Sequence, residues 1–161
     1  MIKLNIDFDK KQVKQFNDCF NDLFLSYKAS IGWFPDRNTT HKNNKKSSEI
    51  ASIHITGSPA GRVPQRNFIG IAMNDYKEQI TGAFQNAVKN TEIKKGWMFP
   101  ILKYTGIFIL DLFNRFLNNN GEGKLTPLSE QTKKRKGHDR MLEETKKMKD
   151  DMQVKIVKNY E

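Results

Sequence analysis

Three histidines and one pair of adjacent aspartates are the side chains most suited to acid-base or nucleophilic chemistry. His41 lies in a polar stretch, His54 in a short helical pattern and His138 in a basic run. Hydrolysis or group transfer needs a nucleophile beside a base, or metal ligands that converge on one pocket. Asp150 and Asp151 are consecutive, and consecutive side chains do not face one point on a helix. The pattern therefore predicts no catalytic residue, no metal site and no cofactor, so we do not expect an enzyme.

A glycine-containing segment, residues 57–62, is the nearest approach to a phosphate-binding loop. Its sequence, Gly-Ser-Pro-Ala-Gly-Arg, has two glycines but contains Pro59. It also lacks the lysine and hydroxyl residue that contact phosphates in such loops. The segment predicts a turn instead of a nucleotide site.

The chain carries a strong positive charge, because 28 Lys and Arg outnumber 18 acidic residues and give a net charge of +10. Residues 37–66 hold six of these bases against the single acid Glu49. Such a positive field favours binding to nucleic acid, to an anionic surface or to an acidic protein. The charge alone does not distinguish among these partners. The candidates for a basic surface that faces a partner or DNA are Arg37, Lys42, Lys45, Lys46, Arg62, Lys133, Lys134, Arg135 and Lys136.

Aromatic residues close to these bases allow two interpretations. Trp33, Phe34, Phe68 and Tyr76 could stack on the bases of single-stranded nucleic acid in a positive groove. They could also be core residues beside a solvated basic loop, and we favour this second interpretation.

The most apolar stretch runs from residue 97 to residue 117. A membrane span needs about 20 nearly uncharged residues, and this stretch is interrupted by Pro100, Lys103, Gly106, Asp111 and Arg115. It therefore predicts a buried helix and no membrane contact. The N-terminus has no cationic stretch followed by an apolar run, and the single cysteine, Cys19, permits no intrachain disulfide. We expect the chain to be made in the cytoplasm.

The elements that position these residues can be read from the hydrophobic period. Alternation over residues 2–8 predicts a strand, and apolar residues at spacings of three and four predict an amphipathic helix over 10–29. Residues 31–34 predict a second strand that ends at Pro35. Residues 36–46 have no apolar side chain, so we expect a long polar loop that nothing anchors to the core and that is mobile until bound.

The rest of the chain predicts helices and one closing strand. We expect a short helix over 49–54, capped by Ser47 or Ser48 and ended by Gly57, and then a turn over 58–61. Helical spacing predicts long helices over about 66–91 and 98–118, a linker over 118–123 and an alternating strand over 152–157. The predicted fold is α+β, a small antiparallel sheet packed against two or three long helices, with a long polar loop and an extended C-terminal segment. Residues 1–120 form the core, and residues 121–161 are expected to belong to the same domain.

Two stretches, in order, resemble the neck and tail-completion proteins of tailed bacteriophages, including the virion-morphogenesis proteins of Mu-like phages. Residues 48–57 followed by 63–69 are similar to a small-residue helix that ends in His-Glu-Phe-Gly, a variable loop and Pro-Ala-Arg-Pro-Phe-Leu. Residues 127–132, 136–137 and 141–145 are similar to Pro-Leu-Ser-x-x-Thr, a Lys-Gly pair and Pro-Leu-x-x-Thr-Gly. The order of elements over residues 10–158 also agrees. The sequence departs from the family pattern at Ile55-Thr56, Asn67 and Lys146.

The resemblance implies a structural virion protein that completes the tail and joins it to the head. Such proteins assemble as a homo-oligomeric ring on the tail axis, and we expect a hexamer at the neck. Its partners would be itself, the neighbouring connector and the tail-terminator or tail-tube proteins, with passive contact to genomic DNA in the channel. The motif residues, as candidates for subunit contact, are Gly57, Pro64, Arg66, Phe68, Pro127, Leu128, Ser129, Thr132, Leu142 and Thr145.

Two alternatives remain open at the sequence level. Arg66 precedes a predicted helix and could hold a carboxylate or carbonyl of a neighbouring subunit, or a DNA phosphate. The whole chain could also be a basic nucleic-acid-binding module. We expect Ser129 to cap a short helix by accepting a hydrogen bond from the backbone near Thr132.

Overall fold

The computed structural model describes residues 27–41, 43–92, 94, 96–140 and 147–158, together with residues 10, 11, 14, 17 and 18. The strand predicted over 2–8 lies outside these residues, and so do the candidate residues Lys42, Leu142 and Thr145. The described residues between 10 and 18 are helical, in agreement with the predicted amphipathic helix.

The fold is α+β, as predicted. Two strands pair in antiparallel fashion, with register from Tyr27 opposite Lys158 to Gly32 opposite Gln153. The elements in chain order are β1 (Tyr27–Gly32), η1 (Pro35–Arg37), α2 (Ser47–Thr56), α3 (Phe68–Asp75), α4 (Lys77–Lys89), α5 (Met98–Asn118), η2 (Asn120–Gly123), α6 (Glu130–Lys136), α7 (Lys147–Asp150) and β2 (Gln153–Lys158).

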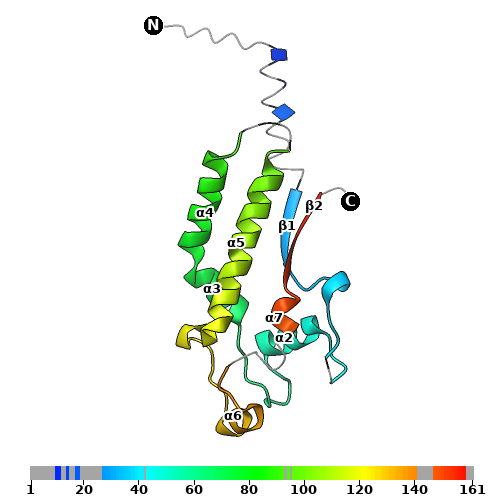
Figure 1. Cartoon of the computed structure of the whole chain (residues 1–161), viewed down its shortest axis with the longest axis vertical. Helices are drawn as coiled ribbons and strands as arrows, with labels where there is room; N and C mark the ends of the chain where they lie inside the picture. The colour runs from blue at the N-terminus through cyan, green and yellow to red at the C-terminus, as the bar shows by residue number, and fades with distance from the viewer. Residues whose placement is uncertain are drawn as a thin grey trace.

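The long helix α5 is the centre of the molecule. It lies between α4 and the two strands, and it contacts all three (Figure 1). Its bounds agree with the helix predicted over 98–118, and Ile101, Leu112 and Phe116 are nearly fully buried along it. Gly106 allows β2 to approach closely, because a Cβ atom there would lie 2.5 Å from Val154 Cγ1. No helix in the described part of the chain is long and apolar enough to cross a membrane.

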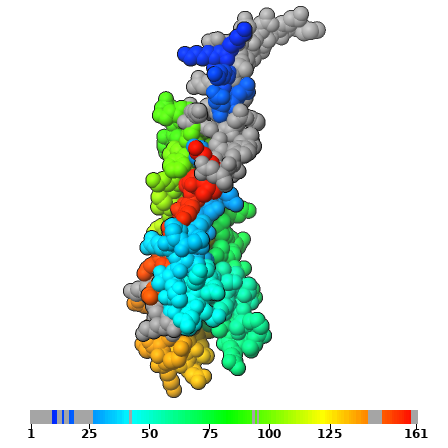
Figure 2. Space-filling view, turned by 90° about the vertical axis from the view of Figure 1, so that its right-hand side faces the viewer, coloured from blue at the N-terminus to red at the C-terminus, as the bar shows by residue number. Residues whose placement is uncertain are grey.

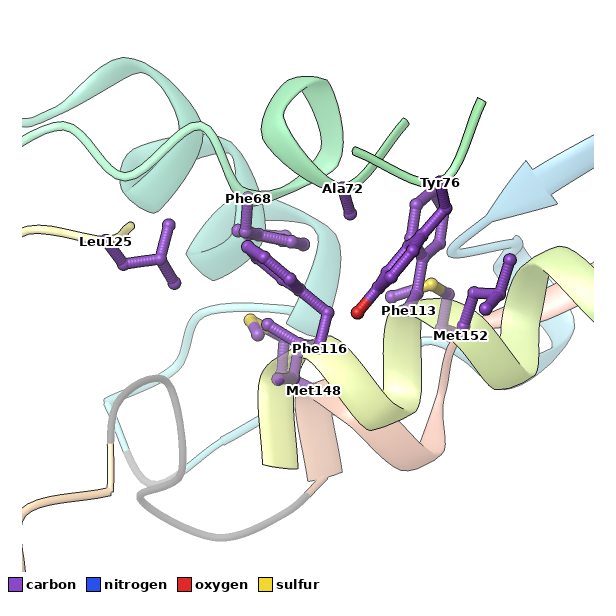
Figure 3. Packing of buried hydrophobic residues seen from close by; sticks show 11 residues of the cluster. Phe68, Ala72, Tyr76, Phe113, Phe116, Leu125, Met148 and Met152 are labelled. Atoms are coloured by element: carbon purple, nitrogen blue, oxygen red, sulfur yellow. The ribbon is translucent and has the colours of Figure 1, made fainter. Parts of the chain in front are cut away.

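The main hydrophobic core forms where α3 and α5 meet the C-terminal segment (Figure 3). Phe68 and Phe116 are fully buried there, and Met148 and Met152 reach the same cluster from around α7. Trp33 packs edge to face on Phe68, with ring centroids 6.4 Å apart. These contacts agree with the core interpretation of the aromatic residues.

The helix predicted over 66–91 is instead two helices, and the break falls at Tyr76. This residue has φ −99° and ψ 10°, and its ring packs edge to face on Phe116. Its hydroxyl donates a hydrogen bond of 2.5 Å to Glu122 Oε1 on η2. Burial and this hydrogen bond raise the pKa of Tyr76 to about 12. Tertiary packing of one tyrosine thus outweighs a continuous helical pattern.

The first described strand begins earlier and ends earlier than predicted. Residues 27–29 were expected to end a helix, but they belong to β1 because they pair with the closing strand. Trp33 lies outside the ladder, which ends at Gly32, and its indole Nε1 donates a hydrogen bond of 2.6 Å to the carbonyl of Met148. Phe34 is also outside, under the ammonium group of Lys155 at 4.9 Å from the ring centroid.

Candidate interaction surface

The first motif stretch covers most of α2 and leads through a turn to the start of α3. Gly57 ends α2 with φ +80°, and a Cβ atom there would lie 3.3 Å from the backbone nitrogen of Gln65. Its positive φ and this close approach both favour glycine. The turn closes with a hydrogen bond of 3.0 Å from the Ser58 N–H to the Val63 carbonyl. Pro64 lies exposed beside it.

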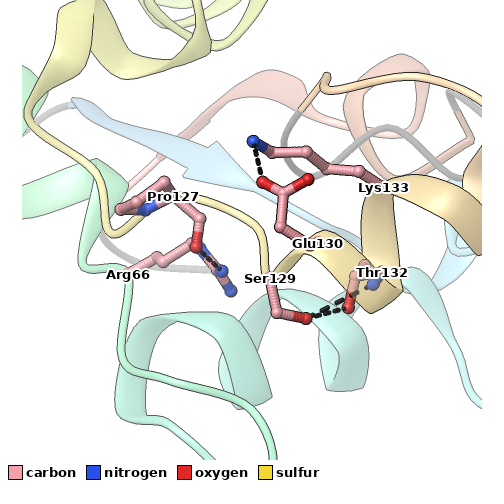
Figure 4. Close-up of polar contacts among 6 residues, drawn as sticks. All are labelled: Arg66, Pro127, Ser129, Glu130, Thr132 and Lys133. Atoms are coloured by element: carbon pink, nitrogen blue, oxygen red, sulfur yellow. Dashed lines mark hydrogen bonds and ion pairs between the residues drawn. The ribbon is translucent and has the colours of Figure 1, made fainter.

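Arg66 joins the two motif stretches (Figure 4). Its Nε donates to the Thr126 carbonyl at 2.7 Å, and its Nη2 donates to the Pro127 carbonyl at 3.1 Å. Its backbone N–H donates to the carbonyl of His54 at 2.6 Å. The residue is only 5% exposed, and burial lowers the pKa of its guanidinium. One side chain therefore holds together segments that are about 60 residues apart in the sequence.

The acceptors of Arg66 are carbonyls, as one sequence alternative expected, but they belong to the same chain. A guanidinium directs its donors in fixed directions, so these two bonds fix the path of residues 126–127 relative to α3. Because the side chain is buried, its role in the isolated chain is structural.

The second motif stretch leads into α6, whose N-terminus is capped as predicted. Ser129 Oγ accepts a hydrogen bond of 3.3 Å from the Thr132 N–H, and the two hydroxyls lie 2.9 Å apart. Lys133 forms an ion pair of 2.7 Å with Glu130, and Gly137 ends the helix in the left-handed conformation. No residue of α6 is buried. The helix is thus formed by local capping and projects from the body of the molecule (Figure 1).

Two apolar motif residues connect this corner to the core. Phe68 is 1% exposed and lies in the main cluster, against which Leu128 also packs. Pro127 and Ser129 are exposed on either side of Leu128. The second stretch therefore has one inward residue flanked by two that face outward.

A cleft of about 270 Å³ opens where the two stretches meet. Arg66, Asn67 and Thr126 contribute to its walls, and so does Lys124, which pairs with Asp75 at 2.8 Å. Asn67 Oδ1 accepts the N–H of Gly70 at 3.0 Å and caps α3. Arg66, Asn67 and Lys124 at the cleft are thus committed to the protein's own structure.

The expectation that nothing anchors the loop over 36–46 is wrong. Asp151, which is 5% exposed, accepts hydrogen bonds from the Thr39 N–H at 2.7 Å, the Thr39 hydroxyl at 3.0 Å and the Ser47 hydroxyl at 2.6 Å. Burial alone would raise the pKa of Asp151, but these hydrogen bonds prevail and lower it. Asn38 adds two contacts to Ser48. Hydrogen bonds to a buried carboxylate thus replace the missing apolar contacts.

Sequence reasoning missed Asp151 because no local pattern separates it from the exposed Asp150. The expected cap of α2 was also wrong. The first helical residue is Ser47, and the backbone N–H of Lys46 donates to Glu49 Oε2 at 2.6 Å. The hydroxyl of Ser47 is directed to Asp151 instead. A cluster of short hydroxyl residues was the signal that the sequence offered.

The described basic candidates fall on three segments at one end of the molecule. Figure 2 shows the loop around residue 40, the segment around residue 60 and α6 in the half of the molecule away from the N-terminus. The side chains of Arg37, Lys45, Lys46 and Arg62 are exposed. On α6, Lys134 and Arg135 are exposed and Lys133 and Lys136 are half-buried.

The described residues contain no group of three or more His, Cys, Asp or Glu positioned to hold a metal ion. The chain matches no protein-family model, no curated protein and no solved structure.

Proposed function

We propose that this chain is a ring-forming structural subunit of the neck of a tailed bacteriophage virion, where it completes the tail and joins it to the head. The observation that carries the proposal is the pair of hydrogen bonds from Arg66 to Thr126 and Pro127. They unite the two stretches on which the family resemblance depends. Motifs that were separate in the sequence act as one structural unit, which supports the view that they are a single feature.

The geometry of this unit suits a docking surface. Arg66, Phe68 and Leu128 hold the corner from inside, while Pro127 and Ser129 face outward. The projecting helix α6 buries no residue of its own, so its surface remains available to a neighbour. A corner that is fixed before binding avoids part of the ordering cost of association.

The charge supports contacts with acidic partner proteins more than with the genome. Duplex DNA carries one negative charge per about 1.7 Å of its axis. A ring of subunits that each carry +10 would retain DNA strongly if its charges lined the channel. We therefore expect most basic residues of the 37–66 region and of α6 to meet acidic rings above or below.

The test is a mass measurement by light scattering or native mass spectrometry, on the chain alone and mixed with connector and tail-terminator proteins. We expect a closed oligomer or a defined complex with one of them. Lys134→Glu together with Arg135→Glu should weaken the complex. Lys77→Glu together with Lys89→Glu, which changes two exposed lysines on α4, is the matched control and should not. A persistent monomer that binds no neck component would overturn the proposal.

The second candidate is a nucleic-acid-binding module, which is favoured by the gathering of exposed bases at one end of the molecule. Duplex binding through phosphate contacts should fall steeply as salt concentration rises. Titration of the chain into labelled duplex at several salt concentrations separates the candidates. Tight binding with a steep salt dependence would favour the module, and weak binding would favour the virion subunit.

A further inference from the structure

The N-terminal half of α5 presents three exposed apolar side chains, and the exposed Lys103 lies among them. Phe99, Tyr104 and Ile107 are 41%, 54% and 53% exposed. At 3.6 residues per turn these three side chains fall within an arc of about 140° on the helix surface. We call this surface, defined by Phe99, Tyr104 and Ile107, the α5 face. They are three of the five large hydrophobic residues that are exposed in the described part of the chain. Exposed apolar side chains are therefore concentrated on this helix.

The N-terminal segment, residues 10–26, has an apolar stripe that requires a partner. Its sequence places Val13, Phe16, Phe20, Leu23 and Phe24 at helical spacing, within an arc of about 100°. The described residues of this segment, Lys10, Lys11, Lys14, Asn17 and Asp18, are helical, polar and exposed. An amphipathic helix is stabilised by burying its apolar side against another surface.

The first residue of β1, which follows the segment directly, contacts the α5 face. Tyr27 packs edge to face on Phe99, with ring centroids 5.7 Å apart and planes at 67°. It also packs against the small cluster of Trp97, Met98 and Ile101 at the start of α5. The N-terminal segment therefore joins the folded body at the edge of the α5 face, and the two apolar surfaces have matching chemistry.

The described residues of the segment do not lie along α5 of their own chain. β1 begins at Tyr27, directly after the segment. The coloured parts of the segment lie beyond the end of α5 in both whole-molecule views (Figures 1 and 2). A second copy is the occupant that this placement favours.

We propose that the α5 face binds the apolar stripe of the N-terminal segment of a second copy of this chain. Each copy would offer one face and one segment, which is a head-to-tail contact that closes into a ring when the rotation permits. The inference rests on the proposed function in so far as the closed assembly is the neck ring, and it names the contact that builds that ring.

The first experiment is sedimentation of the full chain over a range of concentrations. We expect self-association, and Ile107→Glu or Tyr104→Glu should weaken it at least tenfold, because each places a charge in an apolar contact. Met73→Glu adds the same charge at an exposed apolar residue of α3 and should change association little. Circular dichroism melts verify that each variant folds. Unchanged association in both α5 variants, or a wild-type chain that stays monomeric, would overturn the inference.

The second experiment distinguishes a contact between copies from a contact within one chain. Phe20→Glu removes the stripe and leaves the α5 face intact, whereas Ile107→Glu does the reverse. Each variant alone should be monomeric, and an equimolar mixture should form dimers, since one intact stripe meets one intact face. A mixture that stays monomeric while the wild type associates would overturn the proposal.

The two proposals fail in different ways. If the α5 variants still associate and still bind neck components, the contact is wrong and the virion function stands. If the wild type neither associates nor binds any neck component, both fall.

Discussion

Two parts of the molecule, the apolar core and the polar loops around the motif stretches, are held together by different physics. Around α5, the core consists of close-packed apolar side chains, with Phe116 and Ile101 fully buried. Around the motif stretches, two buried charged residues, Arg66 and Asp151, hold loops through hydrogen bonds to main-chain and hydroxyl groups. Apolar packing is non-directional and depends on buried area, whereas these hydrogen bonds depend on geometry and, for Asp151, on pH.

The core and the loops are held differently because their amino-acid compositions differ. Segments 36–46 and 57–67 contain few apolar residues, so burial of surface cannot fix their paths. A buried charge can do so, because each of its bonds is lost if the loop moves. This arrangement suits a surface that must keep its shape while it stays polar enough to meet partners. The four predictions below test this division, from the largest expected effect to the smallest.

The apolar core should show the largest single effect. Phe116→Ala removes a ring that is fully buried between Tyr76 and the C-terminal segment. We expect the free energy of unfolding to fall by about 3 to 5 kcal/mol, with little dependence on pH. Urea denaturation measures it. Met73→Ala, at a residue 42% exposed, is the control and should cost far less. Equal losses in the two variants would contradict the assigned core.

Arg66→Met tests the polar joint of the two motif stretches. The change keeps an apolar stem but leaves the carbonyls of Thr126 and Pro127 without their donor. We expect a loss of about 2 to 3 kcal/mol, because hydrogen bonds to charged groups are the stronger kind. Arg62→Met, at an exposed arginine of the same turn, is the matched control and should stay within about 0.5 kcal/mol. Hydrogen exchange should show faster opening around residues 126–132 in the first variant alone.

Asp151→Asn tests the pH dependence of the loop. The folded state lowers the pKa of Asp151 below its usual 3.8, so the carboxylate stabilises the fold at pH values above that number. This contribution is lost as pH falls through the lower, folded-state pKa. We expect the variant to lose about 1 to 2 kcal/mol at pH 7 and nearly nothing at the acid limit. Denaturation curves from acid pH to pH 7 measure the difference.

Asp150→Asn is the matched control for this experiment, because Asp150 is the exposed neighbour of Asp151. Its stability should follow the wild type over the whole pH range. If both aspartates gave the same profile, the network of Asp151 with Thr39 and Ser47 would not be the cause.

The same division explains which parts of the fold could be predicted from the sequence. The helix α5 was predicted with its bounds because its hydrophobic period is long and a glycine- and asparagine-rich linker follows it. The caps at Gly57 and Ser129 were predicted because their chemistry is local. Contacts between distant polar residues have no such signal. Asp151 and Thr39 are 112 positions apart, and only the fold brings them together.

The candidate site also combines a feature found from the sequence with features that only the tertiary structure provides. Resemblance selected Arg66, but its acceptors on residues 126 and 127 follow from the tertiary structure. The start of β1 at Tyr27 depends on pairing with a strand near the other end of the chain. The break at Tyr76 depends on packing against Phe116 and a hydrogen bond to Glu122. Each of these features needs a partner that no local window contains.

The smallest expected effect is at Gly106, which tests the packing of β2 on α5. In the sequence it reads as an interruption of an apolar run, yet the structure uses it to bring β2 against α5. Alanine improves helix propensity by about 1 kcal/mol, but its Cβ would meet Val154 Cγ1 at 2.5 Å. Overpacking costs about 1 to 3 kcal/mol, so we expect Gly106→Ala to be net destabilising by about 1 kcal/mol.

Gly82→Ala, in α4 with no neighbouring atom within 4 Å, should instead stabilise by about 0.5 to 1 kcal/mol. Thermal melts of the two variants should therefore shift in opposite directions. Shifts in the same direction would mean that the sheet can move away from α5, and the packing of β2 on α5 would then be less close than the structure indicates.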